Sequence, residues 1–250
     1  FTKRKKLDFI STPYDVESAK FLNQIGVKIF KTASADLSDI FLHKYLSQLN
    51  KTIIISTGMS NLQDIEKCLK YYSTKSRKKI YLLHCVSNYP CKKESLNLNC
   101  LDLIEKKFKL KVGFSDHTTD YFASIVAVSK NAKIIEKHFT LNTNMIGPDH
   151  KSSMMPKAFK DYINKIRNTE VILGEKLKKC QMEEYEMKKV SVKGFIVKNN
   201  LNKGQKIKIS NLDLQRPNFG LTGFDLNKIL GRKINRRLVQ YQHIKKQYLD

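Results

Sequence analysis

Short apolar runs alternate with longer amphipathic segments along residues 1–173. The short runs are rich in β-branched and aromatic residues and show little polar alternation, which is typical of buried parallel strands. The longer segments carry apolar residues at helical spacing, as Leu62, Ile65 and Leu69 do. The pattern therefore predicts six strand–helix units, with strands at 8–11, 28–31, 52–56, 80–84, 111–114 and 133–136 and helices at 16–25, 40–49, 62–72, 96–108, 121–131 and 157–173.

Every predicted strand runs into a polar cluster at its carboxyl end, whereas the amino ends carry no such chemistry. This asymmetry is expected of a (β/α)₈ TIM-type barrel, whose active site is built from the loops that follow the strands. Six parallel strands do not close that barrel. One interpretation is an open doubly wound sheet. The other is a TIM-type barrel lacking its first two strands, with two βα units expected before Phe1, and the absence of an initial Met favours it.

The composition and the pattern of apolar residues change after residue 173. Residues 174–190 are charged and lack strand character, which indicates a solvated linker that is helical or irregular. Residues 191–250 contain short β-type runs broken by Gly, Asn and Pro. We therefore predict a partial barrel domain at 1–173, a linker at 174–190 and a small β-rich domain at 191–250.

The chain is strongly basic, with a formal net charge of +24. A nucleic-acid partner would explain such a charge, but the excess is mostly scattered Lys with only seven Arg, and no aromatic-interleaved basic motif occurs. Specific nucleic-acid readers favour Arg. We therefore expect no nucleic-acid partner, and small anionic substrates such as phosphates or carboxylates fit the charge equally well.

Compartment and membrane association are constrained by the cysteines and the apolar runs. The five Cys form no CxxC pair, which favours a reducing cytoplasm without a disulfide framework. No apolar run approaches the roughly 18 residues of a membrane span, and the amino-terminal segment has no apolar core of a signal peptide. We expect a cytoplasmic protein with no membrane partner.

Two histidines, His117 and His138, follow consecutive predicted strands. If those strands are adjacent and parallel, they lie about 4.8 Å apart, and the imidazoles could share one ion at nitrogen–metal distances of about 2.1 Å. Asp116, Glu136 and Asp149 could then support the ligands or contact substrate. Alternatively, each histidine is a structural residue with its hydrogen bonds satisfied.

Seven motifs, taken in order, resemble the sialic acid synthase family, which makes N-acetylneuraminate and related nine-carbon acids. They are STPYD, FKTAS, IIISTGMSNLQDIE, LLHCVSNYP, VGFSDHT, IIEKHFTL and GPDHKSS. The segment KNNLNKGQKIKISNLDLQRPNFGL is similar to that family's carboxyl-terminal SAF domain, which resembles type III antifreeze protein. The resemblance implies a (β/α)₈ barrel with a SAF domain, and condensation of phosphoenolpyruvate with an N-acyl hexosamine such as N-acetylmannosamine, dependent on Mn²⁺ or Mg²⁺.

The resemblance also implies residue roles. His117 and His138 match the metal ligands, and Glu136 is either an orienting carboxylate or a plain salt-bridge partner. The implied phosphoenolpyruvate contacts are Lys31, Ser34, Ser56, Ser87 and Ser115, and the implied sugar contacts are Tyr89, Asp149 and Arg216. Family members form homodimers with swapped SAF domains, in which the residue matching Arg216 enters the partner's barrel.

The sequence departs from the family pattern in two ways. The family's first two strands, which carry a glutamate and a substrate-binding lysine, have no counterpart here, and Asp36 stands where the family usually has Glu. A non-catalytic fragment or ligand-binding remnant of such a synthase is therefore the alternative to an active enzyme.

Overall fold

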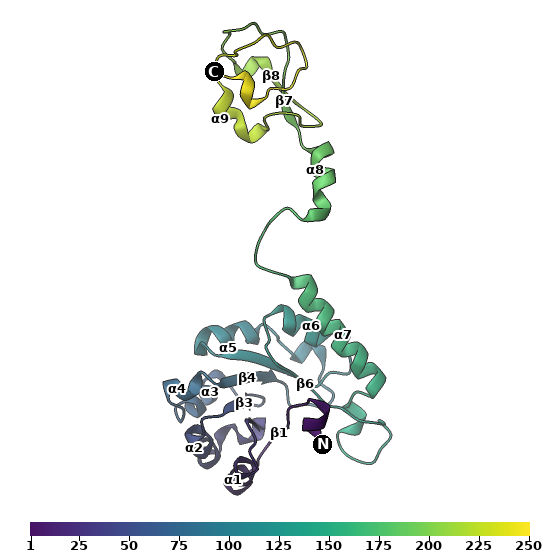
Figure 1. Cartoon of the computed structure of the whole chain (residues 1–250). Helices are drawn as coiled ribbons and strands as arrows, with labels where there is room; N and C mark the ends of the chain where they lie inside the picture. Colours follow the sequence, from purple (N-terminus) through teal and green to yellow (C-terminus); the bar gives the residue numbers. More distant parts are fainter. The chain divides into compact units, whose positions relative to one another are not determined.

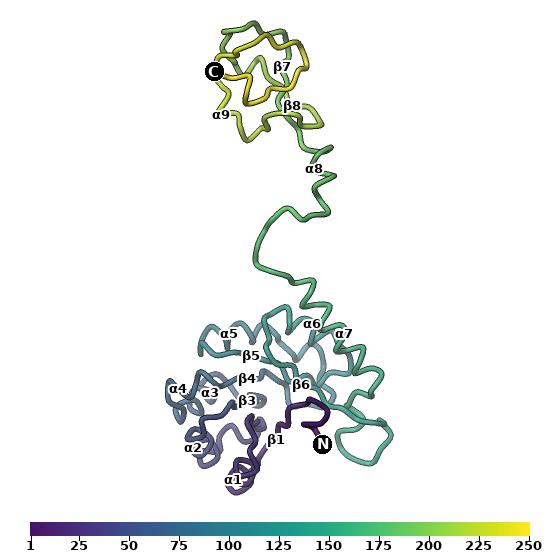
Figure 2. The backbone as a smooth tube through the Cα atoms, viewed as in Figure 1, coloured from purple at the N-terminus to yellow at the C-terminus, as the bar shows by residue number.

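The computed structural model describes residues 1–250 and contains two compact units, Phe1–Glu175 and Lys176–Asp250. The first unit is built on six parallel strands in the order β1-β2-β3-β4-β5-β6 (Figures 1 and 2). The strands are β1 Ile10–Ser11, β2 Ile29–Thr32, β3 Thr52–Ser56, β4 Ile80–Cys85, β5 Lys111–Asp116 and β6 Ile135–Lys137.

Strand order distinguishes between the two arrangements that the sequence left open. A doubly wound sheet reverses direction at a switch point, whereas here each strand pairs with the next one along the chain. Right-handed crossovers between sequential neighbours place every helix on one face of the sheet, and the sheet curls into part of a barrel wall (Figure 2). The first unit is therefore a six-stranded half-barrel.

Helices connect and cover these strands. They are α1 Val16–Gln24, α2 Ile40–Gln48, α3 Leu62–Leu69, α4 Thr74–Arg77, α5 Cys100–Phe108, α6 Phe122–Ser129 and α7 Pro156–Leu173. Asp15, Asp39 and Asn61 cap the first three by accepting hydrogen bonds from backbone amides of the first turn. The core between sheet and helices includes Phe30, Ile55 and Leu82, each with no exposed surface.

Two element boundaries differ from the sequence prediction in ways that matter for the site. The helix expected from residue 96 begins at Cys100, because the preceding residues form a single 3-10 turn and Asn97 adopts a left-handed φ of 41°. Strand β5 extends to Asp116, and its last residues pair with β6. Polar residues at strand ends therefore belong to the sheet and take its alternating orientation.

The second unit has little regular strand. It contains α8 Tyr185–Ser191, the antiparallel pair β7 Gly194–Val197 and β8 Leu212–Gln215, and α9 Leu226–Ile229, with isolated bridges between other segments. Its own apolar core includes Val197, Ile234 and Leu238. Part of the segment predicted as a linker is therefore helical, as α8.

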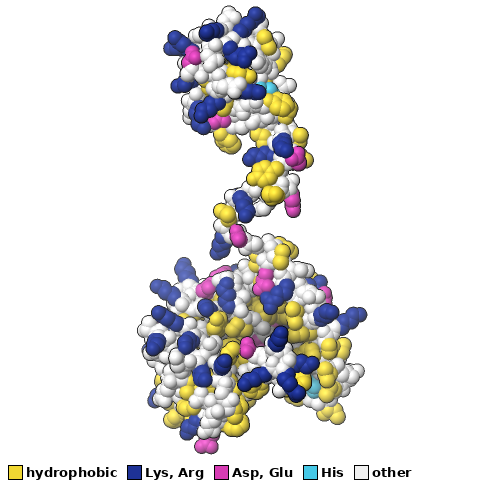
Figure 3. Space-filling view, in the orientation of Figure 1, with side chains coloured by type: hydrophobic (Ala, Val, Ile, Leu, Met, Phe, Trp, Pro, Cys, Tyr) yellow, Lys and Arg dark blue, Asp and Glu magenta, His cyan; other side chains and the backbone are white.

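Charge and apolar surface add two observations. Lys and Arg side chains are scattered over the visible face of each unit, with no large uninterrupted basic area (Figure 3). None of the helices combines the length and the apolar character needed to cross a bilayer.

Candidate active site

The carboxyl ends of β5 and β6 carry paired side chains that face the inner side of the half-barrel. Ser115 lies opposite Glu136 in the strand register, and its hydroxyl donates to Glu136 Oε2 at 2.6 Å. Lys31, from β2, forms an ion pair with Glu136 Oε1 at 3.3 Å. Residues from three strands, which the sequence placed at separate strand ends, therefore meet in one polar cluster.

A second group of small polar atoms gathers after β2, β3 and β4. Ser34 Oγ accepts a hydrogen bond from the Gly58 amide at 3.0 Å and lies 3.1 Å from Cys85 Sγ. A Cβ atom built on Gly58 would lie 2.4 Å from Ser87 Oγ and 2.9 Å from both Ser34 Oγ and Cys85 Sγ. Gly58 therefore leaves the space in which these side chains converge. We call Ser34, Gly58, Cys85 and Ser87 the hydroxyl cradle.

Three side chains near these strand ends have buried polar atoms without a partner, and one of them is Thr32 at the end of β2. Ser56, at the end of β3, is 2% exposed, and its hydroxyl makes no hydrogen bond. Asp36 Oδ2 is likewise unpaired, and burial, followed by the nearby Asp39, raises the pKa of the Asp36 carboxyl. A buried polar group without a partner costs about 1–3 kcal/mol, and such groups commonly serve a ligand.

The two strand-end histidines lie together. The ring centroids of His117 and His138 are 5.5 Å apart, and the Tyr89 ring lies 4.2 Å from the first and 5.3 Å from the second. Two imidazoles that bind one ion at about 2.1 Å must lie within a few ångströms of each other, and these rings meet that condition. Tyr89 forms one wall of the space beside them.

Hydrogen bonds define the state of His117. Its Nδ1 lies 2.7 Å from the Val86 carbonyl oxygen, which only accepts, so Nδ1 carries the proton and Nε2 carries the lone pair. Nε2 lies 3.2 Å from Ser115 Oγ, but that hydroxyl proton is donated to Glu136. Burial, and then the nearby His138, lower the pKa of His117. The neutral ring therefore presents a lone pair with no donor.

The two histidines suit an open metal site better than a closed structural one. No group of three or more His, Cys, Asp or Glu side chains is clustered closely enough to hold a metal. The His117 arrangement, with one ring nitrogen on a carbonyl and the other free, is the usual arrangement of a metal-binding imidazole. Two imidazoles alone do not make a closed four-ligand site, so an ion held between them would keep positions open to substrate oxygens or water.

Two predicted residues remain. Asp149 lies near the site, and Arg216 belongs to the second unit. Asp149 is mostly exposed, and its Oδ2 lies 3.9 Å from His138 Nδ1, at the limit of an ion-pair contact. Arg216 follows β8 in the second unit and is exposed. Ten of the eleven predicted residues therefore belong to the first unit.

Asp116 was expected to support the ligands or to contact substrate, and the second of these roles needs correction. Its side chain is fully buried on the outer face of the sheet, where Ser124 of α6 and Tyr162 of α7 donate to its Oδ2. Side chains alternate between the faces of a strand, so Asp116 points away from the face that Ser115 and His117 share. It makes no substrate contact.

Sequence reasoning missed two members of the hydroxyl cradle, Gly58 and Cys85. Gly58 contributes an amide and an absent Cβ, and neither has a sequence signature beyond a glycine after a strand. Cys85 was treated only as a free thiol. The polar motif that follows each strand was the available signal for both.

The chain resembles known proteins over most of its length. The N,N'-diacetyllegionaminic acid synthase of Campylobacter jejuni is 38% identical over 232 residues, which are 92% of this chain and 70% of that protein. The protein of the same name from Legionella pneumophila is 33% identical over 236 residues, covering 93% and 66%. The crystal structure of an N-acetylneuraminic acid synthetase from Leptospira borgpetersenii, in complex with citrate, superposes with a TM-score of 0.70 at 31% identity, covering 74% and 65%.

The chain thus spans 65% to 70% of the length of these three relatives. The sequence pattern of the NeuB family matches residues 1–178, which include both histidines and the hydroxyl cradle. From this match and these relatives, the chain belongs to the NeuB family.

Proposed function

We propose that this protein condenses phosphoenolpyruvate with the open-chain aldehyde of an N-acyl hexosamine, giving a nine-carbon sialic acid-type sugar and phosphate. The observation that carries the proposal is the convergence, at one edge of the half-barrel, of an anion-binding cluster and a pair of imidazoles. An enzyme is favoured over a ligand-binding remnant because the similar proteins from Campylobacter jejuni and Legionella pneumophila are named as synthases.

Phosphoenolpyruvate occupies the hydroxyl cradle and its surroundings. Lys31 supplies a positive charge, and the hydroxyls of Ser34, Ser56 and Ser87 supply donors for the phosphate and carboxylate oxygens. Ser115, which donates to Glu136 without substrate, would turn its proton to the bound anion. Hydrogen bonds to charged groups are shorter and stronger than neutral ones. The unpaired buried hydroxyl of Ser56 supports this assignment, since a bound anion would satisfy it.

The sugar lies on the histidine side of the cluster. Tyr89, whose ring packs against both imidazoles, and Asp149, beside His138, are placed to hold its hydroxyls. His117 and His138 would hold a Mn²⁺ or Mg²⁺ ion, and the bound ion would polarise the aldehyde as a Lewis acid. The substrate is N-acetylmannosamine or a close analogue. The doubly N-acetylated analogue is included because two relatives are named N,N'-diacetyllegionaminic acid synthases.

The reaction forms one bond between C3 of phosphoenolpyruvate and the aldehyde carbon, whose oxygen takes a proton. Water adds at C2, and one of its protons passes by way of Glu136 to the former aldehyde oxygen. The bond from C2 to the phosphate oxygen then breaks, so that the water oxygen becomes the C2 carbonyl oxygen and the second water proton leaves with the phosphate. Glu136 touches both Ser115 and Lys31, and Ser115 Oγ lies 3.2 Å from His117 Nε2, so Ser115 joins Glu136 to the nearer imidazole. We assign to Glu136 the orientation of these groups and acceptance of the proton from the attacking water.

The second unit is proposed to act as a SAF domain in a homodimer. In that arrangement Arg216 reaches the N-acyl group of the sugar in the partner's barrel. The support is the sequence match around Gln215, Arg216 and Pro217, together with the exposure of Arg216 within its own unit.

The proposal is tested by measuring phosphate release from phosphoenolpyruvate with Mn²⁺ and N-acetylmannosamine or its doubly N-acetylated analogue. The product is identified by mass spectrometry. We expect release to require aldehyde, and His117→Ala to abolish it. The assay is run on this chain and on a form extended by the two expected βα units, because the chain spans 65% to 70% of its relatives.

Release from neither form with any of these aldehydes would contradict the proposed reaction. Undiminished turnover by His117→Ala would contradict the role of the histidines. Release from the extended form alone would keep the reaction and assign the missing chemistry to the preceding units.

A further inference from the structure

Two residue pairs close the carboxyl ends of β5 and β6, and a histidine follows each strand. In the parallel register Ser115 lies opposite Glu136, and Asp116 lies opposite Lys137. The next residue of each strand end is a histidine, and the two imidazoles lie close together. Because side chains alternate between the faces of a sheet, the outward Asp116–Lys137 pair lies between one inward pair and the two histidines, all assigned to the active site.

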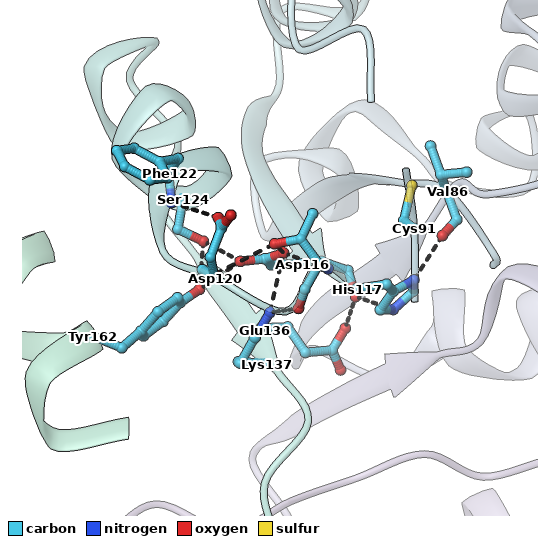
Figure 4. A network of polar contacts seen from close by, with 12 residues as sticks. Val86, Cys91, Asp116, His117, Asp120, Phe122, Ser124, Glu136, Lys137 and Tyr162 are labelled. Carbon is cyan, nitrogen blue, oxygen red and sulfur yellow. Dashed lines mark hydrogen bonds and ion pairs between the residues drawn. The ribbon is translucent and has the colours of Figure 1, made fainter. Parts of the chain in front are cut away.

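The outward pair, Asp116 and Lys137, is buried and has many hydrogen-bond partners (Figure 4). The Asp116 side chain is 0% exposed and the Lys137 side chain 2% exposed, and their ion pair measures 3.2 Å. Burial lowers the pKa of Lys137, and the charge of Asp116 opposes that shift. Five groups donate to the Asp116 carboxylate: the Thr118 amide and hydroxyl, the Lys137 ammonium, the Ser124 hydroxyl and the Tyr162 hydroxyl.

Lys137 makes a second contact that determines what the pair does. Its ammonium also donates to the backbone carbonyl of Thr118. Lys137 therefore binds the residues on both sides of His117, Asp116 through its side chain and Thr118 through its backbone. Lys137 is itself the residue immediately before His138. One ammonium thus links the backbone around one imidazole to the backbone of the other.

We propose that the buried Asp116–Lys137 pair is a positioning device that fixes the separation and orientation of His117 and His138. This inference rests on the proposed role of the two histidines in holding a divalent ion. Ser124 and Tyr162 extend the device to α6 and α7, which anchor the carboxylate from the outer face. Neither Asp116 nor Lys137 touches substrate, and both act through the imidazoles.

The expected effect is on metal affinity. Groups that orient metal-binding histidines from the outer shell typically contribute about 10- to 100-fold to affinity. Removing only Lys137 would leave a buried carboxylate uncompensated, which threatens the fold itself. The better test replaces both charges by neutral groups of similar size, as Asp116→Asn together with Lys137→Met.

Mn²⁺ binding is measured by electron paramagnetic resonance of the free ion and by calorimetry, on the full chain, with circular dichroism as the folding check. We expect the double variant to weaken Mn²⁺ binding at least tenfold. Lys130→Met is the matched control, because it breaks the ion pair with Asp102, which lies on helix α5. It should bind Mn²⁺ as the unaltered chain does.

The outcomes separate the inference from the function on which it rests. If the unaltered chain binds Mn²⁺ and His117→Ala does not, the metal role stands, and a folded double variant with unchanged affinity overturns the inference alone. If the double variant does not fold, Tyr162→Phe decides, since it removes one donor to the carboxylate. Unchanged Mn²⁺ affinity in that variant, with a lowered melting temperature, would reduce the pair to a purely structural role.

A metal-free measurement covers failure of the metal role. Nitrogen-15 spectra of labelled histidine report the tautomer of His117, which the Val86 carbonyl holds with the proton on Nδ1. If the unaltered chain binds no Mn²⁺, the metal function fails. A single His117 tautomer that becomes a mixture in the folded pair variant, or in Tyr162→Phe, would then still support positioning. An unchanged spectrum would overturn it.

Discussion

Gly58→Ala tests the hydroxyl cradle with the addition of one carbon atom. The new Cβ would lie 2.4 Å from Ser87 Oγ and 2.9 Å from Ser34 Oγ and Cys85 Sγ. All three atoms are ends of short side chains that can rotate, and Gly58 does not have a left-handed φ. The fold should therefore survive, and the damage should fall on the side chains that we assign to phosphoenolpyruvate.

The magnitude follows from the hydrogen bonds that rotation would remove. A hydrogen bond to a charged group contributes about 1.5–3 kcal/mol. Since about 1.4 kcal/mol is tenfold in affinity, turning one hydroxyl away should raise the Kd for phosphoenolpyruvate by about ten- to a hundredfold. The effect should be on the Kd, measured by calorimetry without sugar, because the cradle acts before any chemistry.

Gly223→Ala is the matched control. A Cβ at Gly223 would meet only Leu214 Cδ1, at 3.5 Å, which is an ordinary van der Waals contact, and Gly223 belongs to the second unit. This variant should bind phosphoenolpyruvate like the unaltered chain. A folded Gly58→Ala protein with an unchanged Kd would refute the assignment of these side chains to the anion.

Three further predictions concern pH, the core and the second unit. Burial lowers the pKa of His43, which is fully buried against Tyr72 and the Asp36 carbonyl. Below about pH 6.5 the unfolded chain therefore binds more protons than the folded one, so the melting temperature should decrease as the pH is lowered. The decrease should be smaller in His43→Gln than in the unaltered chain. Ile55 lies in β3 with no exposed surface. Ile55→Val should lower the free energy of unfolding by about 0.5–1.5 kcal/mol and Ile55→Ala by about 2–5 kcal/mol, measured by denaturant titration. Equal losses in the two variants would contradict its place in the core. Arg216→Ala should raise the KM for the N-acyl hexosamine at least tenfold and leave the Kd for phosphoenolpyruvate unchanged, and an unaltered sugar KM would remove Arg216 from the proposed site.

The sequence alone determined the strand–helix units of the first unit and the edge at which the candidate site residues lie. These features are local or repeat along the chain. A buried parallel strand must be an apolar run, an amphipathic helix must repeat near every 3.6 residues, and catalytic side chains must follow the strands. His117 and His138 were singled out in this way, since each follows its strand directly. Family motifs then added roles that spacing could not give.

The tertiary structure decided which of these side chains meet and which face they occupy. The register that sets Ser115 opposite Glu136 and Asp116 opposite Lys137 is a property of two strands together, and neither strand encodes it alone. Asp116 was expected to support the ligands or contact substrate, yet side-chain alternation along β5 turns it toward the helices on the outer face. No local sequence pattern gives the strand order either, because strand pairing is a long-range contact. The observed sequential order distinguishes a half-barrel from a doubly wound sheet.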